Sequence, residues 1–249
     1  MFEAAAPLSP MLRKLEYWAF LNEEDRAALL ALPHTLKRIE RHHYIVREGD
    51  KPTHSCLMVS GLSYRHKIVA DGARQIVSIQ MAGDVVDLQN SLLGTGDHNV
   101  QALTTCQVAF IPCEAIRKIA FDRPAIGQAM WYDTLVDGSI FREWIANIGR
   151  RDARTRLAHL LCEYALRLEA AGLGSHVTWE LPMTQEQLGD CTSLTPVRVN
   201  RMLKALESDG LISRSQRSVT VNDWTELAAT GDFDSTYLHL PEHKLALVQ

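Results

Sequence analysis

The sequence predicts an α+β fold with an N-terminal β-roll (jelly-roll-like) domain, one long helix and a C-terminal winged helix-turn-helix domain. Three observations lead to this prediction. Between residues 46 and 111, short apolar or alternating runs are separated by turn signals roughly every 10 residues, as in β-sandwiches and barrels. From about residue 124 the apolar positions follow a helical period. Residues 182–221 then combine two capped helices with a short basic ribbon.

Composition limits the classes of protein to consider. The chain of 249 residues is long enough for two domains, and its 46% hydrophobic and 22% charged residues are ordinary for a globular protein. A net charge of −4 excludes a surface that is basic throughout, so any nucleic-acid site must depend on local clusters of Arg and Lys. The five cysteines form no CxxC pair, so neither a zinc or other metal site nor a disulfide framework is indicated.

No membrane or export signal is visible in the sequence. It contains no run of 18 apolar residues, and its first 18 residues lack the basic segment and apolar run of a signal peptide. We therefore expect a cytoplasmic protein without a membrane partner.

The β-roll prediction covers residues 1–123. Residues 8–32 are expected to form two helical pieces, of which Asn22 caps the second and Pro33 closes it. Glycine turns then punctuate the strand-like runs, and Asp71-Gly72 is the clearest hairpin turn. The remaining turn pairs are Gly49-Asp50, Ser60-Gly61 and Gly83-Asp84.

Residues 124–149 are expected to form a dimerisation helix, because they carry apolar residues on two sides. One side can pack on the β domain, while the other repeats in steps of four and three, as in a coiled coil. Pairing with a second copy would bury this second seam, although packing of both sides within one chain is the alternative. The predicted seam comprises Met130, Thr134, Asp137, Phe141, Trp144 and Ile148.

A helix-turn-helix is predicted within the third domain, residues 150–230. Thr184 and Gln187 can form a capping box at the start of the first helix. Thr195 can cap the second helix, with Pro196 at its first position, where a missing N–H is tolerated. Two strand-like runs joined by the polar turn 214–217 follow as a wing.

The outer face of the second helix is basic, which suits the major groove of DNA, where Arg and Asn side chains meet guanine and adenine edges. Another group of arginines lies upstream, at residues 150–156. The alternatives are an ordinary amphipathic helix pair with a solvated outer face, or a surface that docks a partner protein. The candidate DNA-binding residues are Thr184, Thr195, Pro196, Val197, Arg198, Asn200, Arg201, Lys204, Arg214 and Arg217. The C-terminal tail, residues 231–249, receives no role.

Over about residues 12–225, this order of elements resembles the Crp/Fnr superfamily of bacterial transcription regulators. The resemblance rests on the spaced Gly49-Asp50, Gly61 and Gly83-Asp84, and on the segment LTPVRVNRMLKALESDGLI (Leu194–Ile212). It implies a homodimer that reads a pseudo-palindromic site and contacts RNA polymerase if it is an activator. The β-roll domain would receive the controlling signal.

The resemblance also implies how bases are read. Arg201 falls on the arginine that reads guanine in the cyclic-AMP-responsive branch of that family. The Arg and Glu readers of the same helix fall on Pro196 and Val197, which cannot make the same hydrogen bonds. We therefore expect a different half-site, with Val197 suited to a thymine methyl group.

The expected effector region departs from the family pattern. No arginine occurs between Arg74 and Arg117, which argues against cyclic AMP, and no cysteine precedes Cys56, which argues against the N-terminal iron–sulfur cluster. His98 could ligate a haem iron or sense pH, or be a surface histidine beside Asp97. The candidate effector-region residues are Gly83, Asp84, Asp87, Leu88, His98 and Val100.

No enzyme is predicted, since the sequence contains no GxSxG, HExxH or P-loop motif and no paired-carboxylate pattern. The signal, the target genes and the choice between activation and repression stay open at this point.

Overall fold

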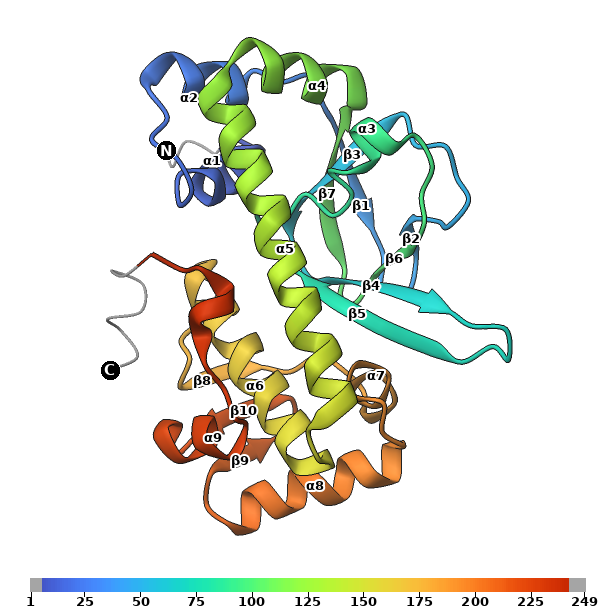
Figure 1. Ribbon diagram of the computed structural model, residues 1–249, viewed down its shortest axis with the longest axis vertical. Helices are drawn as coiled ribbons and strands as arrows, with labels where there is room; N and C mark the ends of the chain where they lie inside the picture. Colours follow the sequence, from blue (N-terminus) through green and yellow to red (C-terminus); the bar gives the residue numbers. More distant parts are fainter. Residues whose placement is uncertain (1–5, 242–249) are drawn as a thin grey trace. The chain divides into compact units, whose positions relative to one another are not determined.

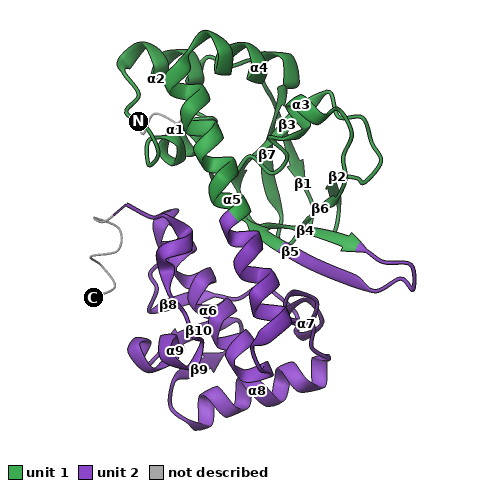
Figure 2. Cartoon of the chain, in the orientation of Figure 1, with its two compact units in different colours: residues 1–67, 78–138 green, residues 68–77, 139–249 purple. Residues whose placement is uncertain are grey.

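The computed structural model describes residues 6–241, in which a β-rich domain, a long helix and a helix-turn-helix follow one another in the predicted order (Figure 1). The chain forms two compact units, one of Met1–Lys67 and Ser78–Gly138, the other of Ile68–Val77 and Ser139–Gln249 (Figure 2). Helix α5 (Pro124–Arg150) contributes its first half to unit 1 and its second half to unit 2. Within the described residues, no helix is long and apolar enough to span a membrane.

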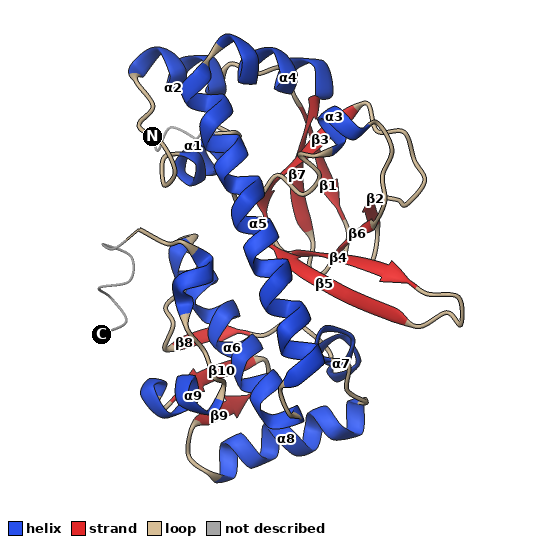
Figure 3. Cartoon of the chain, viewed as in Figure 1, coloured by secondary structure: helices blue, strands red, loops and turns tan. Residues whose placement is uncertain are grey.

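Unit 1 contains two antiparallel sheets (Figure 3). The first has the order β1-β7-β3, formed by Thr35–Ile39, Cys106–Pro112 and His54–Ser60. The second has the order β2-β6-β4-β5, formed by Tyr44–Val46, Asn99–Ala102, Ser63–Ile68 and Arg74–Gln80. Residues of both sheets, among them Val46, Met58, Val100 and Val108, share one buried cluster. The predicted β-roll is therefore confirmed.

Two details of these sheets differ from the prediction. The single run expected at residues 100–111 is two strands, β6 and β7, because the chain turns at Thr104 and Thr105. Gly61 fits beside this turn with φ +83°, and a Cβ there would lie 2.6 Å from the Thr105 carbonyl oxygen. Strand β1 was not predicted.

Helices cover one end of unit 1: α1 (Ser9–Leu15), α2 (Glu23–Leu30), α3 (Asn90–Leu93), α4 (Cys113–Asp122) and the first half of α5. Asn22 caps α2 in a capping box with Asp25, as predicted for this position. The helices bury a second apolar cluster, in which Met11 and Leu15 of α1 join Ile126 and Ala129 of α5.

Unit 2 is built around α6 (Ala153–Ala170), which packs against α7, α8 and α9. Helices α7 (Gln185–Thr192) and α8 (Pro196–Ser208) form the helix-turn-helix. The wing has three strands, in the order β8-β10-β9, formed by Thr178–Glu180, Ser218–Val221 and Ile212–Ser215. Helix α9 (Trp224–Thr230) and the 3₁₀ turn η1 (Ser235–Leu238) follow, and residues 242–249 of the predicted tail lie outside the described residues.

The exposed apolar stripe of α5 is offset by one residue from the predicted seam. Met130 and Trp144 are only 4% and 7% exposed, because Met130 packs in the unit 1 core and Trp144 bonds to Glu163. The most exposed large apolar side chains on this helix are instead Trp131, Leu135 and Ile145, at 68%, 56% and 67%. Of the other predicted seam residues, Thr134 is exposed, while Asp137, Phe141 and Ile148 are half-buried.

Candidate nucleic-acid interface

Helix α7 begins with the predicted capping box. The Thr184 hydroxyl accepts a hydrogen bond from the Gln187 amide (3.2 Å), and the Gln187 side chain accepts one from the Thr184 amide (2.9 Å). Leu188 and Cys191 lie on the buried face of the helix. The local sequence therefore determines where this helix starts and which side packs inward.

The turn between α7 and α8 depends on Gly189, which the sequence analysis did not identify. Helix α7 ends at Ser193 in the left-handed conformation, with φ +54°. The chain then returns so closely over α7 that a Cβ on Gly189 would lie 2.3 Å from the Leu194 carbonyl oxygen. Thr195 caps α8 by accepting a hydrogen bond from the Arg198 amide (3.3 Å). The crossing of the two helices is thus set by the absence of a side chain at Gly189.

Helix α8 has one buried and one exposed side. Val199, Leu203 and Leu206 are at most 1% exposed. Val197 is 81% exposed, and its neighbours Arg198, Arg201 and Lys204 are exposed too. Asn200 is half-buried, while Thr184, Thr195 and Pro196 are exposed at the helix starts. Across residues 6–241, no ion pair engages Arg198, Arg201 or Lys204, so these cations are available to a polyanion.

The wing holds its two candidate arginines differently. Arg214 forms a two-pronged ion pair with Glu207 of α8, with nitrogen–oxygen distances of 3.0 and 2.7 Å. Hydrogen bonding by this guanidinium lowers the pKa of Glu207. Arg217 is exposed near Gln216, the residue with positive φ at the strand turn. Arg214 therefore connects β9 to α8, whereas the exposed guanidinium of Arg217 is the wing cation that solvent, or a polyanion, can reach.

The upstream arginines do not form a second basic surface. Arg154 pairs with Asp209 (2.6 Å), and Arg151 pairs with two carboxylates discussed below. Arg156 donates to the Thr192 carbonyl oxygen at the end of α7 (3.1 Å), which supports the turn. Arg151, Arg154 and Arg156 thus make contacts within the chain. Most of their partners lie far away in the sequence, so the sequence pattern does not indicate this role.

The tip of the β4–β5 hairpin, Ile68–Val77, belongs to unit 2 and contacts α7. Arg74 pairs with Asp190 at 2.7 Å, and the side-chain Nε2 of Gln75 donates to the backbone carbonyl oxygen of Asp190 at 2.6 Å. The Ser193 hydroxyl donates in turn to the Gln75 side chain (3.0 Å). A hairpin whose strands begin in the β-roll sheet therefore holds the end of α7.

In unit 1, Asp84 has structural partners. It accepts hydrogen bonds from the Met81 amide (2.9 Å) and from Lys14 (2.7 Å), and Lys14 also pairs with Asp133 of α5 (2.8 Å). Gly83 has φ +100°, and a Cβ there would lie 3.0 Å from the Pro10 carbonyl oxygen of α1. Leu88 and Val100 pack in the two apolar clusters. Four of the six predicted effector-region residues thus build the fold.

The other two, Asp87 and His98, are buried close to a cation that the sequence argument missed. Arg65 of β4 is 5% exposed, donates to the Val86 carbonyl oxygen (2.5 Å) and lies 3.8 Å from the Asp137 carboxylate. Burial, together with the charge of Arg65, lowers the pKa of His98. Arg65 lies in β4, which precedes the arginine-free segment between Arg74 and Arg117, so that segment gives no indication of this buried cation.

Burial raises the pKa of Asp87 to about 7, although its carboxylate accepts a hydrogen bond from the Cys56 amide (2.7 Å). Because the folded-state pKa is above the unfolded value, ionisation opposes folding, and stability falls as pH rises from about 4 to 7. We expect the free energy of unfolding to be larger at pH 5 than at pH 8, by up to about 3 kcal/mol from this group, since about two pH units of its titration interval lie between pH 5 and the folded-state pKa.

The Asp87→Asn variant keeps an acceptor for the Cys56 amide but cannot ionise, so this part of the pH dependence should disappear. Urea unfolding at pH 5 and pH 8 measures it. The exposed Asp50→Asn variant is the control and should keep the parental pH dependence. Identical pH profiles for the Asp87→Asn variant and the parent would contradict the assignment.

Comparison with known proteins agrees with this geometry. Residues 36–123 match the family described as a cyclic nucleotide-binding domain, and residues 155–230 match the Crp-like helix-turn-helix domain. The transcriptional activator protein FnrL of Cereibacter sphaeroides is 29% identical over 195 residues, covering 77% of this chain and 78% of that protein. The fumarate and nitrate reduction regulatory protein of Salmonella typhimurium is 26% identical over 213 residues, covering 84% and 83%.

The fold also matches solved structures. FixK2 from Bradyrhizobium japonicum superimposes with a TM-score of 0.74 at 22% identity, over 80% of this chain and 98% of that one. The regulator CLP of Xanthomonas campestris, described as responsive to c-di-GMP, gives a TM-score of 0.65 at 17% identity, over 81% and 100%. With both domains matched in the order that the structure displays, the chain belongs to the Crp/Fnr family of transcription regulators.

Proposed function

We propose that the protein is a homodimeric transcription regulator that reads a pseudo-palindromic DNA site through α8. The observation that carries this proposal is the exposed face of α8, where Val197, Arg198, Arg201 and Lys204 lie together without ion-pair partners among the described residues. Arginine can donate two hydrogen bonds to guanine, and an exposed valine suits a thymine methyl group. Of the wing residues, Arg217 is the proposed phosphate contact.

The proposed dimer surface is the exposed apolar stripe of α5 and its surroundings in unit 1. An apolar groove of about 700 Å³ is lined by Leu88, Leu92, Phe121 and Trp131, among others. Leu92, Phe121 and Trp131 are 71%, 77% and 68% exposed, which is unusual for large apolar side chains without a partner. A second copy would cover this surface and bring two α8 helices to successive major grooves, about 34–36 Å apart.

The proposed input acts on the β-roll domain and reaches unit 2 through the β4–β5 hairpin and α5. The contact of Arg74 and Gln75 with the end of α7 supports the hairpin route. The signal itself stays unassigned. Because a curated relative is named a transcriptional activator, RNA polymerase is the proposed further partner, and the cytoplasm is the proposed place of action.

Selection of bound duplexes from a random library, followed by fluorescence anisotropy, tests the proposal. The expected result is an enriched inverted repeat, bound by two chains, with affinity that falls steeply as salt is raised, because phosphate contacts release counterions. No enrichment and no salt-dependent binding would contradict it. In that case the exposed face of α8 would favour the other candidate function, docking of a partner protein.

A further inference from the structure

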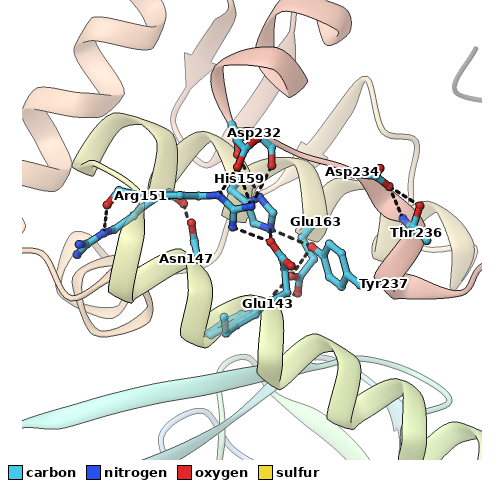
Figure 4. Close-up of polar contacts among 12 residues, drawn as sticks. Glu143, Asn147, Arg151, His159, Glu163, Asp232, Asp234, Thr236 and Tyr237 are labelled. Carbon is cyan, nitrogen blue, oxygen red and sulfur yellow. Dashed lines mark hydrogen bonds and ion pairs between the residues drawn. The ribbon is translucent and has the colours of Figure 1, made fainter.

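The segment after α9, residues 231–239, is packed onto the region where α5 meets α6, and nothing in the function proposed so far uses it. Figure 4 shows Asp232 and Tyr237 directed toward a polar cluster of both helices, while Asp234 and Thr236 contact one another. Tyr237 stacks on His159 of α6 with an interplanar angle of 15° and a centroid distance of 5.8 Å. Its hydroxyl donates to Glu163 at 2.8 Å. The C-terminal segment is therefore a built part of unit 2.

The buried carboxylate of Glu163 joins three segments of the chain. From α5, the Trp144 indole N–H donates to both oxygens at 3.0 and 2.9 Å. From α6 itself, Arg167 lies at 3.4 Å, and from the C-terminal segment comes the Tyr237 hydroxyl. Glu163 is only 1% exposed, so each donor compensates for water that the carboxylate has lost. Removal of one donor therefore weakens the connection that Glu163 makes between α5, α6 and the C-terminal segment.

A second set of contacts repeats this connection beside the short link between the helices. Arg151 pairs with Glu143 of α5 (2.7 Å) and with Asp232 of the C-terminal segment (3.0 Å). The Gly231 carbonyl oxygen lies 3.1 Å from Nδ1 of His159, and a Cβ on Gly231 would lie 2.8 Å from the His159 amide nitrogen. The backbone thus approaches α6 as closely as a glycine allows.

These contacts lie beside the two-residue link between α5 and α6, since α5 ends at Arg150 and α6 begins at Ala153. We propose that residues 231–239, which we call the C-terminal clamp, fix the angle between the end of α5 and α6 and so determine the half-site spacing that the dimer accepts. The inference rests on the proposed function. It makes Tyr237 and Glu163 positioning residues, which touch no DNA themselves.

Half-site spacing is a readout that a merely stabilising role would not change. One added base pair moves a half-site by about 3.4 Å and turns it by about a tenth of a helical turn, so a fixed angle strongly disfavours it. The measured quantity is the ratio of the affinity for the selected inverted repeat to the affinity for the same repeat with one base pair added or removed. An isolated half-site duplex measures reading by α8 alone.

Two clamp variants are compared with two controls. Tyr237→Phe keeps the stacked ring and removes the hydroxyl, and a chain that ends at Gly231 removes the clamp beyond its first residue. The controls are Tyr44→Phe in β2 and a chain that ends at Pro241, which keeps the clamp. We expect the spacing ratio to fall at least about tenfold in both clamp variants, because the Tyr237 hydroxyl donates to the charged Glu163 and also lies 3.1 Å from His159 Nε2. The ratio should stay unchanged in the controls.

The outcomes separate the clamp from the proposed function. A parent protein that binds no inverted repeat overturns the proposed function and, with it, the spacing role. A parent that binds, with a spacing ratio unchanged in Tyr237→Phe and in the chain ending at Gly231, overturns the clamp alone. If the shortened chain also loses half-site binding, it has lost its fold, and Tyr237→Phe decides the question by the same ratio.

Discussion

Replacement of Gly189 by alanine is expected to destabilise unit 2 by about 3 kcal/mol and to abolish sequence-specific DNA binding. The added Cβ would lie 2.3 Å from the Leu194 carbonyl oxygen. Because that oxygen belongs to the backbone, no flexible side chain can move aside to make room. The α7–α8 crossing must open, which displaces Arg201 from its position relative to the wing. Thermal unfolding and anisotropy on the selected site measure the two effects.

Gly174→Ala is the matched control in the same unit. A Cβ at Gly174 has Thr178 O as its nearest neighbour at 3.9 Å, an ordinary contact. This variant should unfold and bind DNA as the parent does. Equal behaviour of the two alanine variants would show that the turn tolerates a side chain and that the described crossing is wrong.

Replacement of Lys14 by methionine is the second large effect, a loss of about 3–5 kcal/mol from unit 1. Burial alone would lower the pKa of Lys14, but Asp133, Asp84 and Asp137 raise it above the usual range. The lysine therefore stays charged and satisfies two buried carboxylates, at 2.7 and 2.8 Å. Methionine fills a similar volume and leaves both carboxylates buried without their cation.

Lys118→Met removes an exposed pair with Asp122 at one-turn spacing, which solvent screens, so its free energy of unfolding should stay close to that of the parent. Urea unfolding of the two methionine variants at one pH gives the comparison. If both lose the same small amount, the Lys14 cluster does not hold α1 and α5 in unit 1.

The helix-turn-helix could be predicted closely because its signals are local. Thr184 with Gln187, and Thr195 with Pro196, are caps whose partners lie three residues away in the sequence, and the structure contains them at these positions. The alternation of Ser218 to Val221 likewise located the second wing strand. The role of Gly189 was missed, because it depends on the path of the chain after the turn.

Features that depend on partners far along the chain could not be predicted. The exposed apolar stripe of α5 lies one residue from the predicted seam, because Met130 and Trp131 are both apolar and only the unit 1 core decides which is buried. Arg65 lies inside the β-roll although its strand reads as polar. The C-terminal clamp pairs Tyr237 with Glu163 across 74 residues, so no local pattern indicates it.

Base reading by Arg201 of α8 is tested by repeating the library selection with the Arg201→Ala variant. Arg201 is exposed, so its loss should leave the fold intact. We expect the variant to lose the preference for one guanine in each half-site, with binding to that site weakened by about 1–3 kcal/mol and preferences elsewhere retained. Unchanged preference at every position, with specific binding as tight as that of the parent, would contradict it.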